Sequence, residues 1–137
     1  MITTLSVNTR ARIQLVDITD EIQKLVKEAE LGDGMVHVYC PHTTAAVTIN
    51  ENCDASVQKD IGDTLSQLIP HHSNYAHSEG NADAHIKAAL MGSSRALFVQ
   101  EGKVKLGTWQ GIFLCEFDGP RDREVWLKFI KNPDTEV

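Results

Sequence analysis

The sequence has little of several features that define protein classes. It holds three cysteines (Cys40, Cys53 and Cys115), an odd number without a CxxC spacing, which argues against a disulfide framework and fits a reducing cytosol. We interpret each of them as a small buried apolar residue rather than a nucleophile. No apolar run approaches the roughly 18 residues that a membrane-spanning helix needs, and residues 1–10 lack a signal-peptide pattern. The sequence therefore predicts a cytoplasmic protein that does not enter a membrane.

Basic residues are also scarce. Lysine and arginine number 13 against 19 aspartates and glutamates, which gives a formal net charge of −6. Nucleic-acid-binding domains usually carry a basic stripe that displaces counterions, and none is visible here. The hydrophobic fraction of 42% and the charged fraction of 23% are ordinary for a folded domain. We therefore expect a single globular domain over residues 1–137, without a nucleic-acid partner.

Hydrophobic periodicity predicts three helices and eight strands. The helices cover Asp17 to Leu31, Asp54 to Leu68 and Ala82 to Met91, and their starts and ends carry capping or helix-breaking residues: Asp17 or Thr19, Asp54, Asn81, Gly32, Pro70 and Gly92. The strands lie around Leu5 and Val7, around Ile13 and Leu15, and over 35–40, 45–50, 95–100, 104–109, 112–117 and 124–130. The order ββα-ββ-αα-ββββ clusters the strands, which indicates an α+β fold.

Three of the six histidines lie where side chains from different elements can meet. His42 falls between two predicted strands, His77 lies in a polar loop, and His85 shares a helix face with Asn81. Three imidazoles from three elements make a metal site of the kind that keeps a position open for water or substrate. Alternatively, His77 is exposed to solvent in its loop, and His85 forms a hydrogen bond with a neighbouring residue. We interpret the remaining three as structural or solvated: His37, His71 and His72.

Two further segments carry polar residues at predicted turns or between glycines. Asn50 and Glu51 end a predicted strand, where Glu51 can act as a base or counter-charge, or be a solvated carboxylate. Trp109 and Gln110 lie between two glycines, which weaken a strand unless another backbone or a ligand comes close. Trp109 can stack on a planar ring while Gln110 reads its polar edge. The alternative is a bulged strand with a tryptophan in the core.

A charged turn near the C-terminus contains Arg121 and Arg123. Two guanidinium groups beside Gly119-Pro120 can clamp a phosphate or a carboxylate bidentately. The alternative is a tight turn in which both arginines pair within the chain, with one of three neighbouring carboxylates: Glu116, Asp118 or Asp122.

These segments occur together in an order that resembles a known family. The matching segments are His42–Ala45 with Ile49–Glu51, His77–His85, Gly107–Gln110 and Asp118–Arg123. They resemble the YjbQ-like family, also called the secondary thiamine-phosphate synthase family, from about Arg10 to Lys131. The stretch from Ser94 to Ile112 resembles the most specific signature of that family.

The resemblance implies a compact α+β fold with two mixed or antiparallel sheets. It also implies a homotrimer, a pocket near the subunit boundary, and a metal ion held by the residues matching His42, His77 and His85. Imidazole ligands favour Zn²⁺ over Mg²⁺. The family name implies the joining of an aminopyrimidine diphosphate to a thiazole phosphate, as a weak or secondary activity.

We therefore expect a metal-dependent enzyme that acts on a small phosphorylated or heterocyclic substrate. Glu51 is the expected catalytic residue for proton transfer. The expected substrate-binding residues are Asn50, Asn81, Trp109, Gln110, Arg121 and Arg123. The alternative is a non-catalytic protein that binds a small anionic metabolite or a metal ion.

Overall fold

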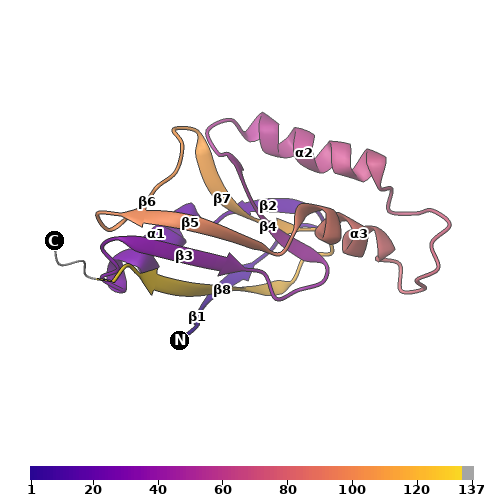
Figure 1. Cartoon of the computed structure of the whole chain (residues 1–137). Coiled ribbons are helices and arrows are strands. Elements are labelled where there is room, and N and C mark those ends of the chain that lie inside the picture. Colours follow the sequence, from indigo (N-terminus) through magenta and orange to yellow (C-terminus); the bar gives the residue numbers. More distant parts are fainter. Residues whose placement is uncertain (134–137) are drawn as a thin grey trace.

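Residues 1–133 form eight strands and three helices (Figure 1). The structure is a computed structural model and describes residues 1–133. The elements in chain order are β1 (Thr3–Asn8), β2 (Gln14–Asp17), α1 (Thr19–Glu28), β3 (Gly34–Tyr39), β4 (Ala45–Glu51), α2 (Ala55–Leu68), α3 (Ala82–Met91), β5 (Ser94–Gln100), β6 (Lys103–Val104), β7 (Gln110–Glu116) and β8 (Asp122–Lys131). The predicted order and the α+β class are confirmed.

The strands form two sheets. One has five strands in the order β1-β8-β3-β5-β6, and the other has three in the order β2-β7-β4. Each pairing between the described strands is antiparallel, so the sheets are antiparallel rather than mixed. Among residues 1–133, no helix is long and apolar enough to cross a membrane.

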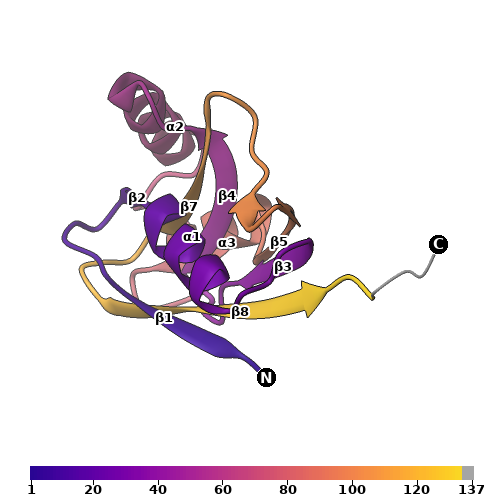
Figure 2. The same cartoon turned by 90° about the vertical axis from the view of Figure 1, so that its left-hand side faces the viewer.

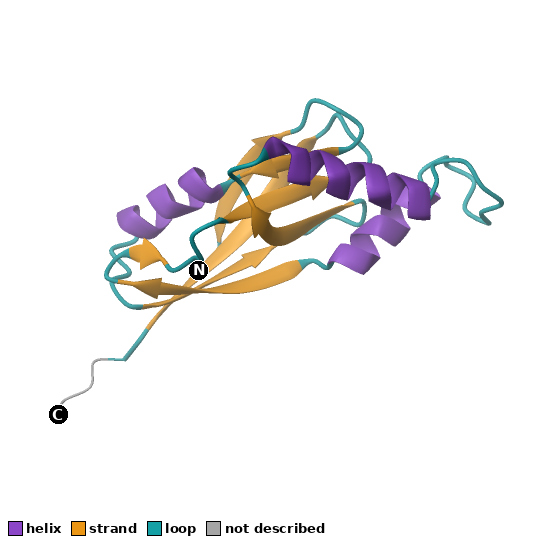
Figure 3. Ribbon diagram, turned by 90° about the horizontal axis from the view of Figure 1, so that it is seen from above, coloured by secondary structure: helices purple, strands orange, loops and turns teal. Residues whose placement is uncertain are grey.

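The three-stranded sheet is buried on both faces. Ile112 and Leu114 of β7 belong to the main core, together with residues of α1 and of the five-stranded sheet. Phe113 and Cys115, which point to the other face, pack in a second core with residues of α2 and α3. The layers are therefore the five-stranded sheet, then the three-stranded sheet with α1, then α2 and α3. Figure 2 shows α1 between the sheets and α2 above them, and Figure 3 shows α2 across the top.

Several local predictions need correction. The strand expected over 104–109 is wrong beyond Val104, because the chain turns back there, with the Gln110 N–H donating to the Gly107 carbonyl at 3.1 Å. The helix expected to start at Asp17 begins at Thr19, whose N–H donates to the Asp17 carboxylate at 2.9 Å. Cys53 is exposed, so its prediction as a buried residue is also wrong.

Candidate functional site

His42 lies just past the end of β3 and follows Pro41, which has no backbone N–H to continue the sheet ladder. Its Nε2 accepts a hydrogen bond from the Glu124 N–H of β8 at 2.9 Å, so the side chain satisfies a donor that β3 no longer reaches. Because Nε2 accepts, the proton of the neutral ring lies on Nδ1. Burial and the positive charge of Arg123 lower the pKa of His42, which keeps the ring neutral at pH 7.

His77 and His85 lie against each other. Their ring centroids are 5.3 Å apart, and the ring planes meet at 83°. Zinc–nitrogen distances of about 2.0–2.1 Å place two imidazole rings on one tetrahedral ion with their centres about 5 Å apart. The two rings are therefore spaced to share an ion.

His42 and His85 line a common cavity of about 350 Å³. That volume lies in the range of small-molecule sites. The other lining residues are small or polar, and they are Thr43, Ala45, Ala88, Ala89, Gly92 and Ser93. In the part of the chain from 1 to 133, no three His, Cys, Asp or Glu side chains are arranged to hold a metal ion. His42 would have to release the Glu124 N–H and turn before three imidazoles could meet at one ion.

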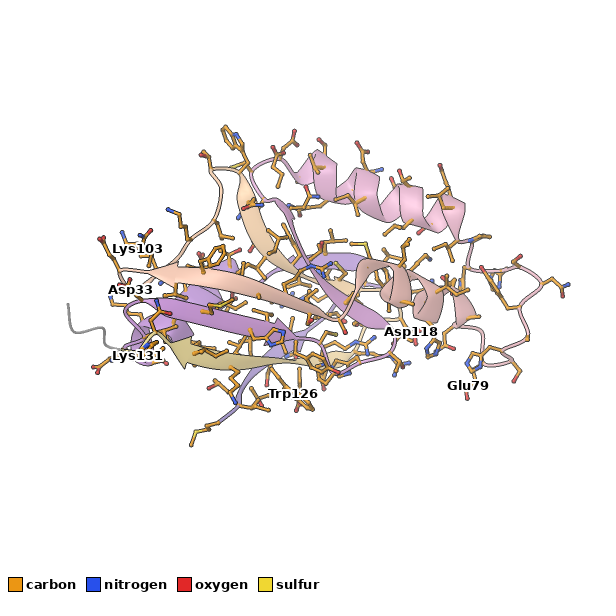
Figure 4. The ribbon with its side chains drawn as sticks, in the orientation of Figure 1. Asp33, Glu79, Lys103, Asp118, Trp126 and Lys131 are labelled. Atoms are coloured by element: carbon orange, nitrogen blue, oxygen red, sulfur yellow. The ribbon has the colours of Figure 1, made fainter. Side chains whose placement is uncertain are left out.

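Asp118 links two of the predicted binding residues. Its Oδ2 accepts hydrogen bonds from Asn81 Nδ2 and from Arg121 Nη2, both at 2.9 Å. Burial alone would raise the pKa of Asp118, but these bonds and the positive charge of Arg121 outweigh burial and lower it. The Oδ1 atom of Asn81 is buried and has no hydrogen-bond partner. Figure 4 shows Asp118 beside α3 at the end of the molecule that also carries Glu79.

Arg123, near the start of β8, is buried, with 5% of its side chain exposed. Its Nε donates to Glu116 Oε1 at 2.9 Å, and its Nη2 donates to Glu116 Oε2 and to Thr44 Oγ1. Burial alone would raise the pKa of Glu116, but the hydrogen bonds from Arg123 and Thr9 outweigh it and lower that pKa. The structure thus shows the intramolecular pairing that the sequence left open, and direct contact of Arg123 with a ligand stays a prediction.

The other predicted residues lie at the far end of the β4–β7 ladder. Ala45 faces Glu116 at one end of this ladder, and Glu51 faces Gln110 at the other. Six residues of extended strand span about 20 Å. In Figure 1 this second end lies beside the start of α2, away from α3. We call it the β4–β7 tip, defined by Asn50, Glu51, Trp109 and Gln110. Within one chain these residues do not meet the histidines.

The β4–β7 tip is held by hydrogen bonds of its own. The Asn52 N–H donates to the Trp109 carbonyl at 3.0 Å, and the Gly107 N–H donates to Gln110 Oε1 at 2.8 Å. A Cβ at Gly111 would lie 2.5 Å from Asn52 Nδ2, so this close approach requires glycine. The Trp109 side chain projects outward with 61% of its surface exposed. The alternative of a core tryptophan is therefore wrong within the chain.

One buried charge cluster carries no signal in the sequence pattern. Asp83 accepts hydrogen bonds from Lys87 at 2.7 Å and from Arg12 at 2.9 and 3.1 Å, and both Asp83 and Lys87 are buried. Their spacing of four residues is common for exposed ion pairs on helices. Only the tertiary contact with Arg12 shows that the pair is internal. The cluster of Arg12, Asp83 and Lys87 fixes the first turns of α3 and, with them, the position of His85.

The comparisons with known proteins agree with the resemblance to the YjbQ-like family. The family model described as UPF0047 protein YjbQ-like matches residues 3–132. A UPF0047 protein of Methanocaldococcus jannaschii is 52% identical over 124 residues, which is 90% of each chain. The UPF0047 protein YugU of Bacillus subtilis is 43% identical over 131 residues, which is 95% of this chain and 99% of the relative.

Two solved structures share the fold over nearly their whole length. A YjbQ/UPF0047 family protein of Clostridium acetobutylicum has a TM-score of 0.91 and 52% identity, over 93% of this chain and 99% of the other. A hypothetical protein of Aeropyrum pernix has a TM-score of 0.92 and 34% identity, over 96% of this chain and 99% of the other. The chain therefore belongs to the UPF0047 family of YjbQ-like proteins.

Proposed function

We propose that the chain is a metal-dependent enzyme that acts on a small phosphorylated or heterocyclic substrate at the cavity of His42 and His85. The observation that supports this most is the gathering of three imidazoles from three elements at one end of the molecule, two of them spaced to share an ion. Neutral imidazoles favour a zinc-like ion, and such an ion would polarise a substrate oxygen or activate water. Weak thiamine-phosphate synthase activity and a homotrimeric assembly are the finer parts of this proposal, and they rest on the resemblance.

Arg121 is the proposed contact for an anionic substrate group. Its side chain is 52% exposed, and its Nη2 shares the Asp118 carboxylate with Asn81. Arg121 can therefore turn toward a phosphate while Asp118 keeps its bond to Asn81. The orphaned Oδ1 of Asn81 offers a buried acceptor for a donor group on the substrate.

A non-catalytic binding protein is the second candidate, and the position of Glu51 favours it. The proposed proton-transfer residue lies about 20 Å along β4 from the histidine end. Within a single chain, the proposed binding residues at the histidine end therefore lie far from the Glu51 carboxylate. Glu51→Gln should abolish turnover and leave ligand affinity unchanged if Glu51 transfers a proton. Under the binding hypothesis there is no turnover to lose.

The ligand set is tested by titrating the metal-free protein with zinc in a calorimeter. We expect one ion per chain for the wild type and loss of binding in the His77→Ala, His85→Ala double variant. Zinc at about 100 times its Kd should also stabilise the wild type by about 2.7 kcal/mol in thermal unfolding.

The matched control is His72→Ala, which removes an exposed loop histidine that stacks on His71. This variant should bind zinc as the wild type does. Stoichiometric binding that survives the double substitution would contradict the proposed ligands.

A further inference from the structure

Two side-chain links join the start of α3 to neighbouring parts of the chain. Arg12, between β1 and β2, donates to both carboxylate oxygens of Asp83, at 2.9 and 3.1 Å. Two residues earlier on the α3 side, Asn81 donates to Asp118 at 2.9 Å. Arg12 and Asp118 are themselves neighbours, because the Gly119 N–H donates to the Arg12 carbonyl at 3.0 Å. The two links therefore run side by side, which places the Arg12 guanidinium near the Asp118 carboxylate.

Arg12 and Arg121 act on the same carboxylate. Burial alone would raise the pKa of Asp118, but hydrogen bonds from Asn81 and Arg121 and the positive charges of Arg121 and Arg12 outweigh it and lower that pKa. Both arginines also reach solvent, with 29% of the Arg12 side chain and 52% of the Arg121 side chain exposed. The bonds from Arg12 to Asp83 use only part of the N–H donors that a guanidinium offers. Both arginines therefore keep donors for a ligand.

The charges of this cluster do not balance. Within residues 1–133, its ion pairs join three cations, Arg12, Lys87 and Arg121, to two carboxylates, Asp83 and Asp118. The cluster thus keeps one positive charge. Partly buried charge without a counter-charge is unfavourable, because water cannot fully solvate it. A bound group with a single negative charge would balance the cluster.

Asn81 adds a hydrogen-bond acceptor beside these donors. An ionised carboxylate only accepts hydrogen bonds, so the amide nitrogen of Asn81 must face Asp118, and Oδ1 must be the other atom of the amide. Asn81 occupies the N-cap position of α3, but its side chain accepts no hydrogen bond from the helix. Oδ1 is buried and has no partner among the described residues. A ligand that fits this place therefore donates a hydrogen as well as carrying negative charge.

This group of side chains lies next to the cavity of His42 and His85. The His85 N–H donates to the Asn81 carbonyl at 3.3 Å, so Asn81 precedes His85 by one helical turn, about 6 Å along α3. His85 lines the cavity. An anionic group bound at Asn81 would therefore lie at the edge of that cavity.

We propose that Arg12, Arg121 and Asn81 bind a phosphate monoester in its singly charged form. The two guanidiniums donate to its unprotonated oxygens, and Asn81 Oδ1 accepts a hydrogen bond from its P–OH group. Arg12 thus takes the place in the clamp that the sequence suggested for Arg123, which is buried on Glu116. This inference rests on the proposed function, because it names the substrate group that would be held beside the histidines.

Comparing inorganic phosphate with sulfate tests the acceptor. The two ions are similar in size, but phosphate at about pH 6 is largely singly charged and protonated, whereas sulfate carries no proton. In calorimetric titrations of the metal-free protein at equal ionic strength, we expect phosphate to bind at least about 10-fold more tightly than sulfate, because sulfate leaves Asn81 Oδ1 unpaired. Equal affinity, or no binding of phosphate, would overturn the proposal.

Variants of Arg12 test the second arginine of the clamp. Arg12→Gln should weaken phosphate binding by about ten- to a hundred-fold. Arg12→Lys keeps a cation for Asp83, so it should stay folded, but it lacks the forked donors and should also bind phosphate about 10-fold more weakly. Arg10→Gln removes the same charge from an exposed position nearby and is the control, which should bind phosphate as the wild type does. Unchanged phosphate affinity in folded Arg12→Lys would show that Arg12 only supports α3, and would overturn the proposal.

The zinc titration separates this inference from the proposed function. Phosphate binding that depends on Arg12 and Arg121, in a protein that binds no zinc, would refute the proposed metal dependence and leave the clamp standing. Zinc binding to the His77 and His85 pair, with phosphate binding that depends on Arg121 but not on Arg12, would refute the clamp alone.

Discussion

Arg121 and Arg123 are two residues apart in one turn, yet they occupy different environments. Arg121 lies at the surface on Asp118, and Arg123 lies inside the protein on Glu116. An exposed ion pair contributes little to stability, typically below about 1 kcal/mol, because water and salt screen it. A buried charge that loses its partner is much more costly. The two arginines should therefore differ in what their removal changes.

Arg123→Ala should lower the free energy of unfolding by about 3–5 kcal/mol, because it leaves the Glu116 carboxylate buried and unpaired. Arg121→Ala should change it by less than about 1 kcal/mol and should instead weaken the binding of inorganic phosphate by about ten- to a hundred-fold. Urea unfolding and phosphate titration of both variants measure the two effects. Unchanged phosphate affinity in Arg121→Ala would refute its role in anion binding.

At the scale of elements, the sequence predicts the features that short-range residue patterns determine, such as a helix and its cap. The stripe from Val57 to Leu68 predicted α2, and Asp54 caps it as expected, accepting a hydrogen bond from the Ser56 N–H at 2.9 Å. Strand register is set by long-range pairing, so the separation of Glu51 from the histidines could not be read from the sequence. Arg123 looked accessible because arginine is rarely buried, and its partner was identified only as one of three carboxylates.

Gly62 of α2 and Gly111 of β7 differ in whether the structure has room for a Cβ atom. A Cβ at Gly62 in α2 would meet Ile13 Cγ2 at 3.5 Å, an ordinary contact, so Gly62→Ala should stabilise the protein by about 0.5–1 kcal/mol. Gly111→Ala should destabilise it by about 1–3 kcal/mol, because the new Cβ displaces Asn52. Thermal unfolding measures both effects, and a stabilising Gly111→Ala would contradict this account of the tip.

At the scale of the whole molecule, buried charge is concentrated at the histidine end. Three carboxylates there pair with cationic side chains: Asp83 with Arg12 and Lys87, Glu116 with Arg123, and Asp118 with Arg121. These pairs tie the N-terminal strands, α3 and the turn before β8 together. The shape of this end therefore depends on the carboxylates being ionised, which makes its stability sensitive to acid.

Acid should destabilise the metal-free protein through Glu116 in particular. The pKa of this carboxyl is lowered in the folded state, so its contribution is complete above the ordinary glutamate value of about 4.3 and is lost as the pH falls through the folded value. Thr9→Val removes the hydrogen bond from Thr9 Oγ1 to Glu116 Oε1, which measures 2.7 Å, and brings the folded pKa closer to the ordinary one. The variant should therefore be less stable than the wild type at neutral pH.

This deficit should shrink as the pH falls below about 4.3, because both proteins then lose the contribution of the ionised carboxylate. The pKa of His42 is lowered in the folded state, so protonation of His42 also favours unfolding in acid, but it acts on both proteins and cancels in the difference. Urea unfolding of both proteins at several pH values from 7 to 3 measures the difference. Asp63→Asn, which breaks an exposed pair with Lys59 on α2, is the control and should show no such pattern. A Thr9→Val deficit that stays constant down to pH 3 would mean that the hydroxyl acts through packing or through the Arg121 backbone N–H that it also accepts, and not through Glu116.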